Sequence, residues 1–394
     1  MDKKKICVVT GTRAEYGIMK NVLNHINQDC SLELQLIATG THLSQEYGLT
    51  YQEIEQDGFK IDEKVEMLLS VDTTSAIAKS LGLAVIGFSN AYSNLQPDCV
   101  LVTGDRYEAL AAVQTAVIMG IPIAHISGGE ITEGAIDDSI RHAITKLSNI
   151  HFPANETYRK RIIQMGEYPE LVFNVGDPSV ESIYQMDFLE KKELEQFFEI
   201  SLDRIIVVTY HPVTTEPQAA EQQIKELFSA LDECQGYNII ITKANSDHEG
   251  RIINQLIDEY SMQNKDRVRS YFSLGYKRYL STMRLAKAVV GNSSSGIIEA
   301  PILNVPTIDI GNRQKGRMKA ASVIEVDCHK NDIINAIRYI ESAAFKMQIA
   351  NMELMYDGKN TAHKIIEILK AIDMKQLNPK AFYDLVKLGA KYRT

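Results

Sequence analysis

The strongest constraint on the fold is a repeated pattern in which a short apolar run ends in a polar turn that contains glycine. Runs of this kind are typical of parallel strands buried on both faces. Segments with helical periodicity lie between them, and this alternation predicts a doubly wound α/β fold. In the first half of the chain, the predicted strands are 6–10, 32–39, 98–103 and 121–127.

The pattern restarts after Asn174–Ser179 (NVGDPS), which we interpret as a junction preceded by a strand at 171–175. The strands predicted beyond it are 204–209, 237–242, 286–290 and 306–310. A chain of 394 residues is too long for one hydrophobic core. We therefore predict two Rossmann-like domains that face each other across a cleft. Their expected limits are 1–176 and 177–370, followed by a helical tail (371–394, helix at 379–388) that packs back on the N-terminal domain.

Composition excludes several classes of protein. The net charge of −9 argues against non-specific binding of nucleic acid. No apolar run approaches the roughly 18 residues that a membrane span requires. The five cysteines are scattered and form no C-x-x-C pair, so neither a disulfide framework nor a zinc site is indicated. The first residues lead straight into a strand without a cleavable signal, so we expect a cytoplasmic protein with reduced thiols.

In an open parallel sheet, ligands bind outside the carboxyl ends of the strands. The turns at those ends in the first half collect polar side chains: Arg13, His42, Asp105, Arg106 and Glu130. No G-x-G-x-x-G motif follows the first strand, so a dinucleotide cofactor is not indicated.

Carboxylates are concentrated just after the strand at 121–127. Glu130 follows that strand and two glycines, a position suited to acting on a bound ligand. Glu133, Asp137 and Asp138 lie beside or in the first turn of a predicted helix, where acidic residues also stabilise the helix dipole. His42 and His125 have two open interpretations, as reacting groups or as hydrogen-bonded structural residues.

The stretch from Val290 to Arg317 predicts an anion site. A strand, a turn with three consecutive serines and the start of a helix place N–H and hydroxyl donors together. A second loop brings Arg313, Lys315 and Arg317 within five residues, so the two loops could hold a diphosphate from two sides. The alternative is a serine-rich helix cap followed by a basic surface turn.

Taken together, the loop motifs resemble the hydrolysing UDP-N-acetylglucosamine 2-epimerases, a branch of the sugar-nucleotide 2-epimerase superfamily. The resemblance covers nearly the whole chain and rests on motifs that occur in the family's order: 11–17 (GTRAEYG), 104–108 (GDRYE), 125–130 (HISGGE), 137–142 (DDSIRH), 211–212 (HP), 291–296 (GNSSSG) and 311–317 (GNRQKGR). It implies the two-domain GT-B-like fold, with no metal and no nicotinamide cofactor. It also implies a homo-oligomer, either a dimer or a tetramer.

The resemblance assigns roles to matching positions. Asp105, Glu130 and Asp137 would be the acid and base carboxylates, with His211 beside the leaving phosphate. The residues expected to bind UDP or the substrate are Arg13, His42, Asn245, Ser293, Ser294, Ser295, Gly296, Glu299, Arg313 and Arg317. One position departs from the pattern: some relatives carry a glutamate where this chain has Ser127, which shifts the expected acid and base roles to Glu130 and Asp137.

The implied reaction converts UDP-N-acetylglucosamine and water to N-acetylmannosamine and UDP through a 2-acetamidoglucal, a step toward sialic acid. The nearest alternative is the same chemistry on UDP-N,N'-diacetylbacillosamine in legionaminic acid synthesis, and the loop Thr132–Ile136 is a candidate for the discriminating feature. A GT-B glycosyltransferase is a second alternative, which the carboxylate cluster disfavours. A non-enzymatic nucleotide-sugar sensor is a third.

Overall fold

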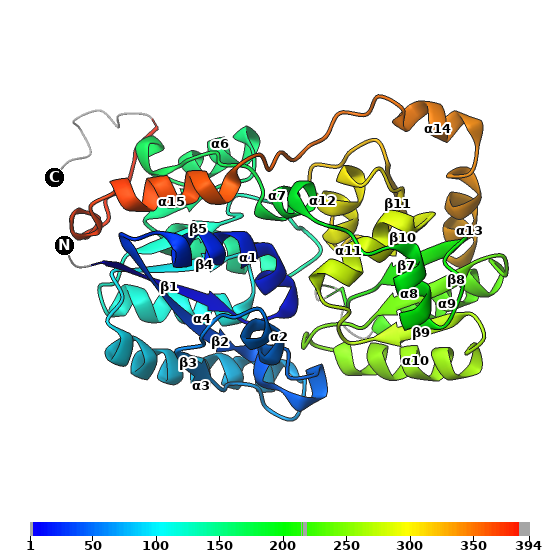
Figure 1. Ribbon diagram of the computed structural model, residues 1–394, viewed down its shortest axis with the longest axis horizontal. Coiled ribbons are helices and arrows are strands. Elements are labelled where there is room, and N and C mark those ends of the chain that lie inside the picture. Colours follow the sequence, from blue (N-terminus) through cyan, green and yellow to red (C-terminus); the bar gives the residue numbers. More distant parts are fainter. Residues whose placement is uncertain (1–2, 214, 216–218, 386–394) are drawn as a thin grey trace.

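The computed structural model describes residues 3–213, 215 and 219–385. Two six-stranded parallel sheets lie side by side, each covered by helices (Figure 1). The first contains, in spatial order, β3 (Glu63–Val65), β2 (Leu32–Thr39), β1 (Lys4–Thr10), β4 (Cys99–Thr103), β5 (Ile123–Ile126) and β6 (Ile150–Phe152). The second contains β12 (Val323–Val326), β11 (Thr307–Ile310), β10 (Ala288–Gly291), β7 (Ile205–Thr209), β8 (Asn238–Thr242) and β9 (Val268–Tyr271). When each sheet is numbered from its own first strand, the order is the same, which confirms the predicted pair of Rossmann-like domains.

The helices connect successive strands and pack on the sheet faces. Those before the second sheet are α1 (Arg13–Gln28), α2 (Tyr51–Gln56), α3 (Thr74–Leu95), α4 (Tyr107–Ile118), α5 (Asp137–Leu147), α6 (Glu156–Gln164), α7 (Pro178–Gln185) and α8 (Lys191–Phe198). Those that follow are α9 (Ala220–Asp232), α10 (Gly250–Gln263), α11 (Tyr276–Leu285), α12 (Ser295–Ile302), α13 (Lys330–Tyr339), α14 (Ala343–Ile349) and α15 (Thr361–Ala371). Short 3₁₀ turns occupy Gly40–Leu43, Gln45–Tyr47, Pro169–Leu171 and Met374–Gln376.

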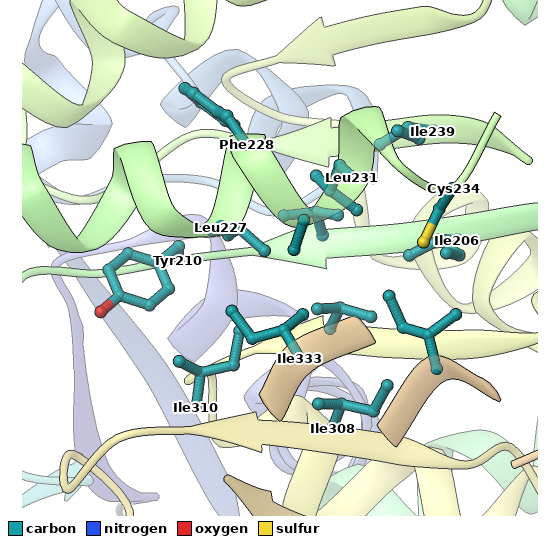
Figure 2. Close-up of a cluster of buried hydrophobic side chains, with 14 of the residues drawn as sticks. Ile206, Tyr210, Leu227, Phe228, Leu231, Cys234, Ile239, Ile308, Ile310 and Ile333 are labelled. Carbon is teal, nitrogen blue, oxygen red and sulfur yellow. The ribbon is translucent and has the colours of Figure 1, made fainter. Parts of the chain in front are cut away.

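Each sheet has a hydrophobic core on both faces because successive side chains of a strand point to opposite sides. In β1, Ile6 and Val8 pack against α1 and α15, whereas Cys7 and Val9 pack toward α3 and α4. In β7, Ile206 belongs to the core under α9, α10 and α13, part of which Figure 2 shows. This two-sided burial explains why the central strands read as continuous apolar runs.

Helix α15 belongs to a different domain from the one that the predicted limits give it. The chain crosses back from α14 along the top of the molecule, and α15 lies over the first sheet (Figure 1). Its buried side chains, including Ile365 and Leu369, join the core that contains α1 and β1. The chain therefore returns to the N-terminal domain before residue 371, and the limits 177–370 counted this helix with the wrong sheet.

The segment after α15 packs on the N-terminal domain, but the described part is not the helix predicted from residue 379. Residues 377–385 contain no helix, and the rest of the predicted helix lies outside the described residues. Lys380 contacts the buried Glu167 at 2.7 Å, and the Tyr383 N–H donates to the Gly166 carbonyl at 2.9 Å.

The predicted strand at 171–175 is also wrong. Within this segment only Val172 makes a bridge, an isolated one to His151 in β6. No helix in the described part of the chain is both long enough and apolar enough to cross a membrane.

Candidate active site

A cavity of about 230 Å³ lies where the carboxyl ends of the two sets of strands face each other. All but two of the residues predicted for the site line it: Arg13, Asp105, Glu130, Asp137, His211, Asn245, Ser293, Ser294, Ser295, Glu299, Arg313 and Arg317. The exceptions are His42 and Gly296. The fold therefore brings together residues that are about 300 positions apart in sequence, such as Arg13 and Arg317.

His42 is buried in the first domain and both ring nitrogens are engaged. Nε2 lies 3.1 Å from the Thr10 hydroxyl, and Nδ1 lies 2.8 Å from the Thr50 hydroxyl. Burial lowers the pKa of His42 to about 4, so the ring is neutral near pH 7. Of the two open interpretations, this geometry supports the structural one.

Gly296 is likewise absent from the cavity lining. It lies in α12 against β11, and its carbonyl accepts from the Thr307 hydroxyl at 2.7 Å. A Cβ atom at this position would lie 2.6 Å from the Thr307 side chain, so the glycine allows the helix to approach the strand. Its place in the motif is explained by packing.

Asp105 follows β4 and is held ionised by arginines. Arg141, fully buried on α5, pairs directly with its carboxylate. Burial alone would raise the pKa of Asp105, but the positive charges of Arg141 and Arg317 bring it below its ordinary value.

Asp137 lies at the first position of α5, and its pKa is shifted in the opposite direction from that of Asp105. Burial raises its pKa to about 7, and the negative charge of Asp105 adds to the rise. The two carboxyls therefore differ in proton affinity within one site, as an acid–base pair requires.

Glu130 follows β5, and its carboxylate pairs with Arg317 across the cleft at 2.8 Å. Burial raises the pKa of Glu130, while Arg317 and Arg141 oppose the rise. Its second oxygen, Oε1, has no hydrogen-bond partner among the described residues, and neither do Nε and Nη1 of Arg317. Buried polar atoms are rarely left unsatisfied, so these atoms mark a place for a polar ligand.

His211, after β7, comes from the second domain. Its backbone N–H donates to the Asn292 side chain at 2.7 Å, and the Asn292 amide donates back to the His211 carbonyl at 2.8 Å. Burial, helped by the charge of Arg313, lowers the pKa of His211 to about 3, so the ring is neutral in the empty site. Its Nδ1 finds no partner in the described part of the chain.

The serine turn and the basic loop meet as predicted at the end of β10. Arg313 Nη1 donates to the Asn292 carbonyl at 3.0 Å, and this bond fixes the guanidinium beside Ser293 and Ser294 in the lining. The first helical N–H groups are less available than the sequence suggested. Those of Gly296 and Ile297 donate to the carbonyls of Ser293 and Ser294.

Glu299 lies one turn into α12. Its Oε1 accepts from the Tyr276 hydroxyl at 3.4 Å, and burial raises the pKa of Glu299 to about 7. Tyr276 and Tyr279 on α11 also line the cavity near Arg13. This end of the cavity thus has aromatic walls and a carboxyl, whereas the carboxylate-rich end lies at the first sheet.

Besides the Glu130–Arg317 pair, further contacts join the domains on two sides of the cavity. Arg106 pairs with Glu108 in its own domain at 3.2 Å and with Asp247 of the other domain at 3.0 Å, and all three are buried. On the other side, the Glu133 N–H donates to the Lys315 carbonyl at 2.9 Å.

Several of these residues were not assigned to the site from sequence. Arg141 stands inside a helix, Asp247 follows β8 in the turn that also carries Asn245, and Gln314 lies between two predicted arginines. Only position in a strand-end turn could have signalled Asp247. No sequence pattern marks a buried helical arginine as the partner of Asp105.

Among the residues that the structure describes, no group of three or more His, Cys, Asp or Glu side chains is arranged to hold a metal ion. The charged groups that face the cavity are instead arginines from both domains and carboxyls mainly from the first.

The fold and this cleft define a GT-B-like protein with a polar, arginine-rich site between two Rossmann-like domains. Residues 24–370 match the family described as UDP-N-acetylglucosamine 2-epimerase, so the chain belongs to that family.

Curated relatives extend over almost the whole chain. It is 43% identical over 387 residues to the GDP/UDP-N,N'-diacetylbacillosamine 2-epimerase (hydrolyzing) of Campylobacter jejuni, a match that covers 98% of this chain and 100% of that protein. It is 35% identical to a UDP-N-acetylglucosamine 2-epimerase of Neisseria meningitidis, over 85% of this chain and 87% of the relative. The crystal structure of a UDP-GlcNAc 2-epimerase from Neisseria meningitidis bound to UDP-GlcNAc has the same fold, with a TM-score of 0.76, 20% identity and coverage of 93% and 99%.

Proposed function

We propose that the protein is a hydrolysing 2-epimerase that converts a UDP-linked 2-acetamido sugar and water to UDP and the free sugar with inverted configuration at C2. The observation that carries the proposal is the set of buried polar atoms that lack partners among the described residues and lie around one cavity. They come from both domains: Glu130 Oε1, Arg317 Nη1, His211 Nδ1 and Gln314 Oε1. A charged, hydrogen-bonding ligand would satisfy them.

Asp137 is the base in this proposal. Its pKa of about 7 makes the ionised form available near neutral pH and still basic enough to remove the C2 proton. Asp105 supports this role by remaining ionised beside it. As the C2–H bond breaks, a C1–C2 double bond forms, the C1–O bond breaks, and its electron pair leaves on the diphosphate of UDP.

The second domain stabilises that leaving charge. Arg313 and the Ser293–Ser295 hydroxyls face the cavity, and fixed donors of this kind act where negative charge develops. His211 is neutral in the empty site, so in this proposal it donates a hydrogen bond to the phosphate. The arriving diphosphate would favour protonation of the ring.

The second half of the reaction adds water across the double bond of the glycal. The hydroxyl adds to C1 and a proton to C2, on the face opposite the one from which the first proton left. Glu130 is our candidate donor because burial raises the pKa of its carboxyl. The proton lost by the attacking water returns to the Glu130 carboxylate. Asp137 releases the proton taken from C2 to solvent, so both carboxyls regain their starting protonation states.

Two substrates remain candidates. The sequence motifs favoured UDP-N-acetylglucosamine, with N-acetylmannosamine as the product. The full-length relative at 43% identity favours UDP-N,N'-diacetylbacillosamine, whose sugar carries a second acetamido group. We place the diacetylated sugar first because that relative is more similar and is covered completely.

Incubation of the purified protein with each UDP-sugar, without any acceptor, tests the function. We expect NMR to detect UDP and a free sugar inverted at C2, with kcat/KM higher for the true substrate. A UDP-linked epimer would contradict hydrolysis. Asp137→Asn is the matched control for contaminating activity.

A further inference from the structure

Thr132 is a buried residue of the loop between Glu130 and Asp137. Its backbone is fixed, because its N–H donates to Asp138 Oδ1 at 2.5 Å and its carbonyl accepts from the Ala135 N–H at 3.0 Å. Its side chain is 3% exposed and lines the cavity. The hydroxyl has no partner within the described ranges. A rigid, buried hydroxyl in a cavity wall is a group held in place for a ligand.

Gln314 has the same property in the other domain. It is 1% exposed, and its Nε2 donates to the Asn292 carbonyl at 2.8 Å. This bond orients the amide, leaving Oε1 as a buried acceptor that lines the cavity and is not bonded to any described residue.

The two loops that carry these groups are in direct contact. The Glu133 N–H donates to the Lys315 carbonyl at 2.9 Å, one residue beyond Thr132 and one beyond Gln314. Gly134 lies so close to the other loop that a Cβ atom there would be 2.2 Å from the Asn312 carbonyl oxygen. Thr132 and Gln314 therefore both lie beside the seam between these loops, and both residues line the cavity.

We propose that Thr132 and Gln314 together bind the acetamido group on C2 of the sugar, and so determine that a 2-acetamido sugar is accepted. The sugar amide N–H donates to Gln314 Oε1, and its carbonyl accepts from the Thr132 hydroxyl. This inference rests on the proposed function.

The hydrogen-bonding groups of Thr132 and Gln314 are complementary to an acetamido group. A secondary amide offers one donor and one acceptor at a fixed separation, matching one acceptor from Gln314 and one donor from Thr132. Thr132 belongs to the loop that joins Glu130 and Asp137, the two carboxyls assigned to chemistry at C2, and all three residues line the cavity. We therefore assign it to the substituent on that carbon. A sugar with a hydroxyl at C2 would leave buried polar atoms unpaired, and sites of this kind discriminate strongly against such analogues.

The test compares UDP-N-acetylglucosamine with UDP-glucose, which differ at C2 only in acetamido versus hydroxyl. Dissociation constants are measured by calorimetry in an Asp137→Asn background, so that substrate is not consumed. The preference is the dissociation constant for UDP-glucose divided by that for UDP-N-acetylglucosamine. We expect Thr132→Val to lower this ratio by about tenfold, the usual scale for one buried hydrogen bond. UDP alone should bind as before, and Thr132→Ser should keep most of the preference.

Thr115→Val is the matched control, since the buried Thr115 hydroxyl is already bonded to the Ala111 carbonyl at 2.7 Å within α4. It should leave the ratio unchanged. If Thr132→Val does not fold, Gln314→Met removes the other partner and should narrow the ratio similarly. An unchanged ratio in a folded Thr132→Val or Gln314→Met protein would overturn the assignment. Absence of wild-type turnover with both UDP-N-acetylglucosamine and UDP-N,N'-diacetylbacillosamine would instead contradict the proposed function, and the binding ratio can be measured in either case.

Discussion

The two domains share one strand order and differ in the chemistry at the ends of their strands. The first presents carboxyls to the cavity, with Asp105, Glu130 and Asp137 after β4 and β5. The second presents His211, Arg313 and the Ser293–Ser295 turn after β7, β10 and β11. Under the proposed function, the same scaffold carries proton-transfer groups on one side and anion-binding groups on the other. The proposed chemistry then resides in the strand-end turns and not in the sheets.

The largest expected effect comes from removing the base. Asp137→Asn keeps the shape of the side chain but cannot accept a proton, so kcat should fall by roughly 10²–10⁴. UDP affinity should stay within about twofold, because the diphosphate is assigned to the other domain. Steady-state kinetics and UDP calorimetry on the same preparation check both. A variant that loses UDP binding together with turnover would contradict the assignment of proton transfer to one domain and UDP binding to the other.

The pH dependence sharpens the same assignment. Asp137 must be ionised to act, so kcat/KM should fall as the pH drops below about 7. In Asp105→Asn the neighbouring negative charge is gone, which lowers the pKa of Asp137 and moves the acidic limb to lower pH. A pH–rate profile of the two proteins measures the shift. A limb that moves upward would show that Asp105 does not raise the pKa of Asp137.

A smaller effect is expected from the second domain. Arg313→Ala should weaken UDP binding by roughly 1.5–3 kcal/mol for each charge-assisted hydrogen bond lost. The loss should be the same for UDP and for the intact UDP-sugar, since both carry the diphosphate. Equal UDP affinity in wild type and variant, measured by calorimetry, would move the diphosphate away from this loop.

The smallest effect should follow from changing His42. His42→Gln removes a ring whose two nitrogens bond the hydroxyls of Thr10 and Thr50 inside the first domain. We expect a loss of about 1–2 kcal/mol in unfolding free energy and little change in UDP affinity. Because the pKa of His42 is lowered to about 4, the unfolded chain binds this proton more readily, and wild-type stability should decline as the pH falls from about 6.5 toward 4. A variant with normal stability but weak UDP binding would show that His42 takes part in binding UDP.

The central strands could be predicted because burial on both faces leaves a continuous apolar run, as in β1 and β7. The edge strands were missed because they are short and carry charge, as β3 (Glu63–Val65) and β12 (Val323–Val326) do. The apolar stripe of α15 showed that one face of the helix is buried, but the sequence of the helix does not indicate which sheet it covers. That choice depends on the path of the whole chain.

The site divides in the same way. Glu130 and Arg313 could be found because a strand-end turn places them at the sheet edge, and the family resemblance supplied the order of the motifs. Their partners could not be found from sequence. Arg141 reaches Asp105 from inside α5, and Arg106 meets Asp247 only because the two domains close together. The pKa values of the carboxyls depend on these contacts, so they too follow only from the three-dimensional structure.

The central claim is that the first domain removes the C2 proton while the second holds the departing UDP. Turnover in D₂O tests it most directly, with the sugar product analysed by NMR and mass spectrometry against a control of free product kept in D₂O without enzyme. We expect one deuterium at C2 of essentially every product molecule, because the proton is removed and then replaced from solvent. Product that retains its original C2 hydrogen would contradict the elimination mechanism, whatever the variants show.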